Sequence, residues 1–143
     1  MNRTSAKLSM LAMSAVFLVG CNSGTYQTNA TDTQLSAYAG QANYPEVQST
    51  KADDLFAVVA PDSTITIYNA GDTPLNNLEL WVNKRYTLHV NKLDAKSMQS
   101  FSPNQLYNKS GTNLGGMPAN SFVSIQIFAD GKLWDVRGPI LQH

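Results

Sequence analysis

Residues 122–136 read Phe-Val-Ser-Ile-Gln-Ile-Phe-Ala-Asp-Gly-Lys-Leu-Trp-Asp-Val, and this stretch decides the predicted fold. Apolar and polar residues alternate before Asp130-Gly131, a dipeptide that strongly favours a two-residue hairpin turn, and a second short run follows it. A period of two residues gives a strand one apolar face and one face open to water. The stretch therefore predicts an antiparallel hairpin near the C-terminal end of a β-rich domain.

The same alternation recurs upstream at residues 63–68, 78–83 and 86–91. A short apolar run bounded by Pro61 occupies residues 55–59, and another strand is expected at about 98–101. Turn-forming residues separate these runs at 69–74 and 83–85. The most helix-like piece after residue 55 is a single turn that Ser102 caps and Pro103 begins. We expect six or seven strands that pack as a small antiparallel β-sandwich over residues 55–143, with a small antiparallel barrel as the alternative.

Composition narrows the function classes. The chain has 143 residues, of which 43% are hydrophobic and 14% charged, and its 10 basic and 10 acidic residues give a formal net charge of zero. This length suits one domain, and the hydrophobic content is too low for a membrane bundle. Balanced charge without a basic block argues against nucleic acid as a partner. The single cysteine excludes an internal disulfide framework.

The first twenty residues differ from the rest of the chain. Arg3 and Lys7 precede an apolar run over residues 8–19, which is twelve residues long. A helix that crosses a bilayer needs about 20 apolar residues, so this run is too short for a stable span. A basic start followed by a short apolar stretch is typical of a secretory signal peptide, which we assign to residues 1–20.

The end of that run, Leu18-Val19-Gly20-Cys21, resembles the lipobox of bacterial lipoproteins. The resemblance implies that Cys21 receives a diacylglyceryl group, that signal peptidase II cuts before it, and that acyl chains such as palmitate anchor the protein in the membrane. Asn22 lacks the aspartate charge that usually retains such proteins in the inner membrane. The resemblance thus implies a cell-envelope location, on the outer membrane and bordering the periplasm if the source is Gram-negative.

Residues 22–54 are rich in Thr, Gln, Ala, Asn and Ser, and Leu35 and Val47 are their only large aliphatic residues. So little apolar surface cannot offset the entropy lost on ordering. We therefore expect residues 21–54 to form the lipidated cysteine and a flexible tether, with the folded domain beginning at residue 55.

A second resemblance concerns residues 63–136. An alternating strand, a turn that contains Asn and Pro, the sequence Asn-Leu-Glu-Leu at 77–80 and a hairpin ending in Tyr86 resemble small immunoglobulin-like domains of exported bacterial proteins. This resemblance implies an immunoglobulin-like sandwich. It includes no catalytic signature and does not fix a function.

Residues for catalysis are scarce. His89 falls on the polar face of its run, His143 is the last residue, and no His-x-x-x-His motif or Gly-x-Ser-x-Gly motif occurs. We predict no catalytic residue, metal site or cofactor, and hence no enzyme. The glycine-rich loop at 108–118 reads as flexible and is one place to look for binding.

Trp81 and Trp134 are the other place. Both fall out of phase with the neighbouring apolar positions, so the pattern puts them opposite the core, unless they fill or cover it. Our leading hypothesis is a non-catalytic protein-binding or envelope-assembly module anchored in the membrane through Cys21. The alternatives are a peptidoglycan- or carbohydrate-binding module that uses both tryptophans, and an inhibitor of an envelope enzyme.

Overall fold

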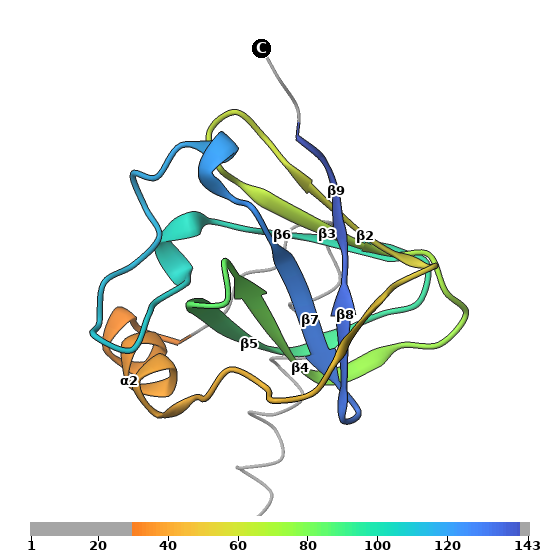
Figure 1. Cartoon of the computed structure of the whole chain (residues 1–143), viewed down its shortest axis with the longest axis horizontal. Coiled ribbons are helices and arrows are strands. Elements are labelled where there is room, and N and C mark those ends of the chain that lie inside the picture. The colour runs from red at the N-terminus through yellow and green to blue at the C-terminus, as the bar shows by residue number, and fades with distance from the viewer. Residues whose placement is uncertain (1–29, 141–143) are drawn as a thin grey trace, which may run out of the picture.

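The computed structural model describes residues 30–140, including the side chains of residues 30–136. The predicted signal peptide, Cys21, Asn22 and His143 lie outside the described residues. The described part contains one α-helix, two short 3-10 helices and nine strands (Figure 1).

The first sheet has five strands in the order β1-β8-β7-β4-β5. These strands are β1 (Ser49–Lys51), β8 (Lys132–Asp135), β7 (Ile125–Ala129), β4 (Leu75–Val82) and β5 (Tyr86–Leu93). All neighbours run antiparallel except β1 and β8, which are parallel.

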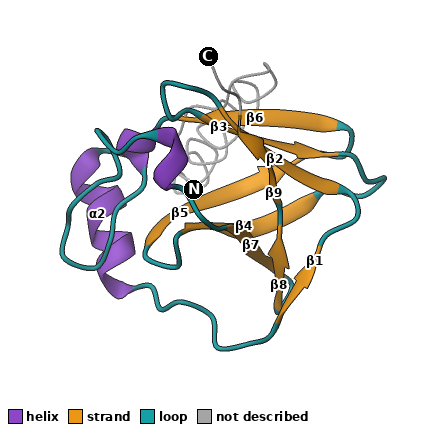
Figure 2. Ribbon diagram, turned by 45° about the horizontal axis from the view of Figure 1, so that its top comes forward, coloured by secondary structure: helices purple, strands orange, loops and turns teal. Residues whose placement is uncertain are grey.

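The second sheet has four strands in the order β6-β3-β2-β9. These are β6 (Ser97–Phe101), β3 (Ile65–Asn69), β2 (Leu55–Val59) and β9 (Arg137–Ile140). β2 and β9 run parallel and the other pairs antiparallel. The described chain is thus mostly β with two separate sheets, as Figure 2 shows, and the predicted alternative of a closed barrel is wrong.

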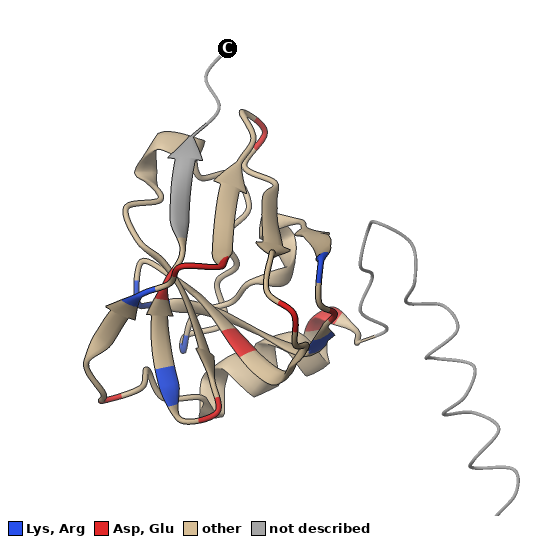
Figure 3. Ribbon diagram, turned by 90° about the vertical axis from the view of Figure 1, so that its right-hand side faces the viewer, with Lys and Arg blue, Asp and Glu red and all other residues tan. Residues whose placement is uncertain are grey.

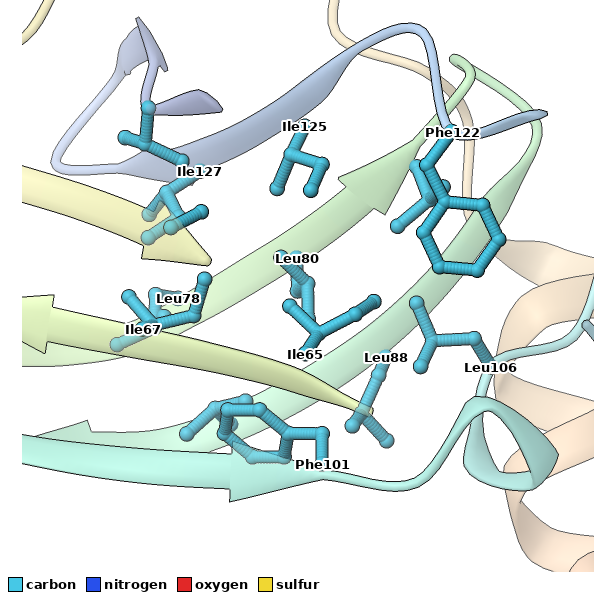
Figure 4. Packing of buried hydrophobic residues seen from close by; sticks show 14 of the residues in the cluster. Ile65, Ile67, Leu78, Leu80, Leu88, Phe101, Leu106, Phe122, Ile125 and Ile127 are labelled. Carbon is cyan, nitrogen blue, oxygen red and sulfur yellow. The ribbon is translucent and has the colours of Figure 1, made fainter. Parts of the chain in front are cut away.

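One apolar cluster joins the inner faces of the two sheets (Figure 4). Leu80 of β4 and Ile127 of β7 meet Ile65 of β3 in this cluster, and each of the three side chains is fully buried. Leu106 and Phe122, which come from loops, extend it at one end. The strand residues Leu80, Ile127 and Ile65 follow the period of two read from the sequence, whereas the two loop residues do not.

The two predicted hairpin turns are present. Asp130 and Gly131 have φ angles of 54° and 76°, and Asn83 and Lys84 have φ angles of 53° and 60°. Left-handed backbone at both central residues matches the right-handed twist of the flanking strands. The predicted single turn after Ser102 is also present, as the 3-10 helix η1 (Pro103–Gln105). A second 3-10 helix, η2 (Ala119–Ser121), precedes β7, which is therefore shorter than predicted.

The expectation of a flexible tether is wrong for residues 30–54. Helix α2 (Asp32–Gln41) begins at a capping box between Thr31 and Gln34, and buries Leu35 and Ala39. Residues 49–51 then form β1 on the edge of the first sheet. Figure 1 shows α2 beside β5. The low apolar content is sufficient because Leu35, small residues such as Ala39 and long-range hydrogen bonds together hold this segment on the sheet.

The central position of Leu80 gives a test of the core. Leu80 is fully buried between the sheets, so Leu80→Ala removes apolar contacts and leaves a cavity. We expect the free energy of unfolding in urea to fall by about 2–5 kcal/mol. Val123→Ala is the control, because Val123 is 70% exposed and its truncation should change stability by about 0.5 kcal/mol or less. Equal losses in the two variants would contradict this arrangement of the core.

Candidate functional site

The outer face of the first sheet is covered rather than open to water. Residues 30–48, here called the covering segment, lie across it and contain α2. Trp81 projects from β4 onto this outer face, opposite Leu80 and Val82, as the sequence predicted. Its side chain is nevertheless only 3% exposed, because the covering segment lies over it and the ring of Tyr44 meets it edge-on at 5.4 Å.

Glu79 fastens the covering segment to the sheet. Its Oε2 accepts a hydrogen bond of 2.5 Å from the Tyr38 hydroxyl, and its Oε1 accepts one of 3.0 Å from Trp81 Nε1. Burial, reinforced by the hydrogen bond and the charge of Glu79, raises the pKa of Tyr38 far above its ordinary value. His89 lies opposite Glu79 across the β4–β5 ladder, with its ring 5.5 Å from that of Tyr38.

A second polar chain fastens the segment further along. The Tyr44 hydroxyl donates to Gln126 Oε1 at 2.6 Å, and Gln126 Nε2 donates to Asp135 Oδ1 at 2.7 Å. Ser49 Oγ completes the chain by donating to Asp135 Oδ2 at 3.0 Å. Tyr38 and Tyr44 therefore hold the covering segment on the sheet at two separate points.

A groove opens between the covering segment and the β4–β5 hairpin, with a volume of about 290 Å³. Tyr44 and Trp81 form its aromatic part, and small side chains at the end of α2 form one wall. Its lining consists of Ala39, Ala42, Tyr44, Trp81, Lys84, Arg85, Asn108, Lys109 and Ser110. No acidic residue of the described part lines this groove, so its charge is wholly positive.

The three groove cations come from two loops. Lys84 and Arg85 occupy the β4–β5 turn, and Lys109 lies in the loop after η1. Lys84 Nζ is 6.0 Å from the centroid of the Tyr44 ring, and Lys109 Nζ donates to Gly40 O at 3.4 Å. Among the described residues the ion pairs join Lys92 to Asp94 and Lys96 to Asp72, so none of the groove cations is neutralised by a carboxylate.

The groove is positively charged, whereas the domain as a whole has nearly equal numbers of basic and acidic residues. Eight of the ten basic residues and all ten acidic residues of the chain lie within residues 30–140. Figure 3 shows basic and acidic positions distributed over several parts of the ribbon, while β2, β3 and β6 contain no charged residue. The groove therefore gathers three cations without any acidic residue, although the domain as a whole contains both signs of charge. Such a local excess of positive charge favours an anionic ligand.

Asn108 adds a polar donor to the groove and is only 8% exposed. Its Oδ1 accepts hydrogen bonds from the backbone nitrogens of Ser110 and Thr112, both at 3.0 Å, and from Ser110 Oγ at 2.9 Å. These bonds fix the orientation of the amide. Within the described residues Asn108 Nδ2 makes no hydrogen bond, so its two N–H groups are available to a ligand in the groove.

Trp134 does not join this site. It pairs with Ile127 across the β7–β8 ladder, so it shares the inner face and packs against the core, with Lys132 Nζ 5.8 Å from its ring. Of the two placements that the sequence left open for Trp134, the structure thus has the one in which it packs against the core. Leu133 occupies the outer face beside Phe128 and is 2% exposed. Because both faces of β8 are buried there, apolarity does not indicate which one faces the core.

The structure brings together part of the predicted binding loop and one predicted tryptophan. Asn108, Lys109 and Ser110 of loop 108–118 line the groove with Trp81, whereas Leu114 of that loop is buried in the core. Tyr44, Lys84 and Arg85 were missed as site residues. Their only sequence signals were an isolated tyrosine and a basic turn, and nothing in the sequence places the two side by side.

Comparison with protein families, curated proteins and solved structures finds no match for this chain. No helix within residues 30–140 has the length and apolarity needed to cross a membrane. Nor do these residues contain a group of three or more His, Cys, Asp or Glu side chains placed to hold a metal ion. The function of the groove is therefore inferred from the chemistry of its lining residues.

The Tyr38–Glu79 contact predicts how stability responds to alkaline pH. Because the folded state raises the pKa of Tyr38, its contribution to stability is complete below pH 10 and is lost progressively above it, where an unfolded tyrosine ionises. Tyr38→Phe lacks this contribution. We expect the variant to be less stable than the wild type at neutral pH and to lose less stability between pH 9 and 11, measured by urea unfolding at each pH. Parallel pH profiles would contradict the contact.

Proposed function

We propose that the two sheets form an immunoglobulin-like β-sandwich. Counted from β2, the first, second and fifth strands (β2, β3 and β6) lie in one sheet, and the third, sixth and seventh (β4, β7 and β8) lie in the other, with β5 beside β4. Immunoglobulin-type domains divide these same strands between their two sheets, which supports the proposal. The parallel β1 and β9 extend this arrangement at the edges. The proposed sandwich begins before residue 55, because the covering segment belongs to its outer layer.

We propose further that the protein is a lipid-anchored protein of the cell envelope. The resemblance of residues 18–21 to a lipobox supports attachment of acyl chains to Cys21. One acyl chain gives only marginal membrane binding, whereas two or three give a stable anchor. Asn22 favours the outer membrane if the source is Gram-negative.

On that anchor, we propose a non-catalytic binding module that holds a negatively charged partner from the cell envelope in the groove. The observation that carries this proposal is the set of Lys84, Arg85 and Lys109, which meet around Tyr44 and Trp81 with no carboxylate in the lining. Lys84, Arg85 and Lys109 are exposed, so their attraction for an anion acts over short range at physiological salt and weakens as salt is added.

The alternative of a carbohydrate- or peptidoglycan-binding module that uses both tryptophans has less support. It requires a tryptophan with an open ring face, but Trp81 is 3% exposed and Trp134 packs against the core. An inhibitor of an envelope enzyme would be one case of the proposed module, in which the acidic partner is the enzyme.

The anchor is tested by intact-mass spectrometry of detergent-extracted protein. We expect a mass equal to the chain from Cys21 plus diacylglyceryl and acyl groups. In Cys21→Ala these groups should be absent, and the protein should leave the membrane fraction. An unmodified wild-type chain in the soluble fraction would overturn the lipoprotein proposal, while leaving the groove untouched.

The groove is tested by crosslinking in cells. Arg85→Glu reverses one groove charge at an exposed turn, so we expect the fold to be kept and the yield of a specific crosslinked envelope partner to fall at least tenfold. Lys92→Glu makes the same charge change outside the groove and should keep the partner. If both variants retain the crosslink, the groove is not the binding site.

A further inference from the structure

We propose that the groove recognises a short acidic peptide segment, with a carboxylate beside Lys84, Arg85 and Lys109 and a small apolar side chain against Tyr44 and Trp81. This inference rests on the proposed function, since it takes the groove as the binding site. It adds the chemical class of the partner, which charge alone does not define.

The size of the groove limits the occupant. Its volume of about 290 Å³ is at the lower end of the range for ligand pockets, roughly 300–1,000 Å³. A space of this size accepts one or two side chains together with the backbone that links them. The buried Trp81 offers no ring face for the successive stacking that single-stranded nucleic acid uses.

The C-terminal end of α2 indicates that the groove suits a peptide better than a simple anion. Ala39 and Ala42 line the groove where the helix ends, and Gly40 O accepts from Lys109 there. The last C=O groups of a helix lack intrahelical partners and carry a partial negative charge. They disfavour a phosphate dianion more than a single carboxylate, because repulsion grows with charge, and those without a partner can accept hydrogen bonds from backbone N–H groups. The groove is thus positive on the loop side and an acceptor on the helix side, which matches a peptide with an acidic side chain.

Asn108 supplies the complementary donor. Because its Oδ1 is held by the backbone of residues 110 and 112, its Nδ2 remains free to donate to a peptide carbonyl or carboxylate oxygen. The residue as a whole is only 8% exposed, but Nδ2 is not among the buried polar atoms that lack a hydrogen-bond partner, so water reaches it in the empty groove. A ligand oxygen that accepts from Nδ2 replaces this water. Asn108 is therefore the proposed specificity-determining residue.

The experiment is a titration of the full-length, isotope-labelled protein in a neutral detergent, followed by NMR. The probes are acetyl-Ala-Glu-Ala-amide, its isosteric Gln peptide, inorganic phosphate and phosphatidylglycerol vesicles. We expect the Glu peptide to shift the Trp81 indole signal and the backbone amides of residues 108–110. The Gln peptide should bind at least tenfold more weakly, and added salt should weaken the binding of the Glu peptide.

Asn108→Asp is the decisive variant. It keeps an oxygen for the backbone donors of residues 110 and 112 but replaces the free donor by a carboxylate oxygen, so affinity for the Glu peptide should fall at least tenfold. Lys92→Gln, outside the groove, should bind within twofold of the wild type. An unchanged backbone spectrum of Asn108→Asp outside residues 107–113 shows that the fold is intact.

The outcomes separate the inference from the proposed function. If phosphate or the vesicles shift the groove signals and the Glu peptide does not, the peptide class is overturned and the anionic-partner proposal stands. If Asn108→Asp binds the Glu peptide like the wild type, the role of Asn108 is overturned. If no probe shifts these signals and Arg85→Glu keeps its crosslinked partner, both proposals fail. A stem peptide from peptidoglycan, compared with the Glu peptide, distinguishes a cell-wall source from a protein source.

Discussion

The carboxylate of Glu79 is the contact on which the outer layer of this molecule depends. One oxygen accepts from Tyr38 and the other from Trp81, so a single charged group joins α2 to the sheet and fixes the indole beside it. A half-buried carboxylate is stable only when its oxygens are paired, because desolvation penalises the charged form. The same two bonds therefore satisfy Glu79 and set the position of Ala39, Ala42 and the groove they line.

The first sheet is covered on both of its faces, whereas the second sheet is covered on one face only. The first sheet has its core face against the second sheet and its outer face under residues 30–48. The second sheet exposes its outer face, where Phe56 stacks on Tyr68 at 6.5 Å and Met98 is 51% exposed. The polar bonds on the outer face of the first sheet are thus partly shielded from water, whereas the groove cations at its margin are exposed.

The strands and turns could be predicted because their signals are local. Alternation within five residues identifies β3, a short apolar run before Pro61 indicates β2, and Asp130-Gly131 defines its own hairpin. The covering segment could not be predicted from its low apolar content, since its two anchoring bonds span 41 and 82 residues of sequence. The capping box of Thr31 and Gln34 was the one local signal for α2. The groove could not be predicted from local signals either, because its lining comes from three segments that are separated in the sequence.

The origin of the groove wall has a consequence for the proposed anchored module. Ala39, Ala42 and Tyr44 belong to the segment that leads from Cys21, while the three cations belong to loops of the sheets. A ligand that contacts both sides binds only when the segment is docked, so its binding free energy also stabilises docking. The linkage is reciprocal: whatever weakens the Glu79 bonds lowers the affinity of the groove. Docking of the segment and occupancy of the groove are therefore coupled through the two tyrosines and through Leu35 and Ala39, which join the core cluster.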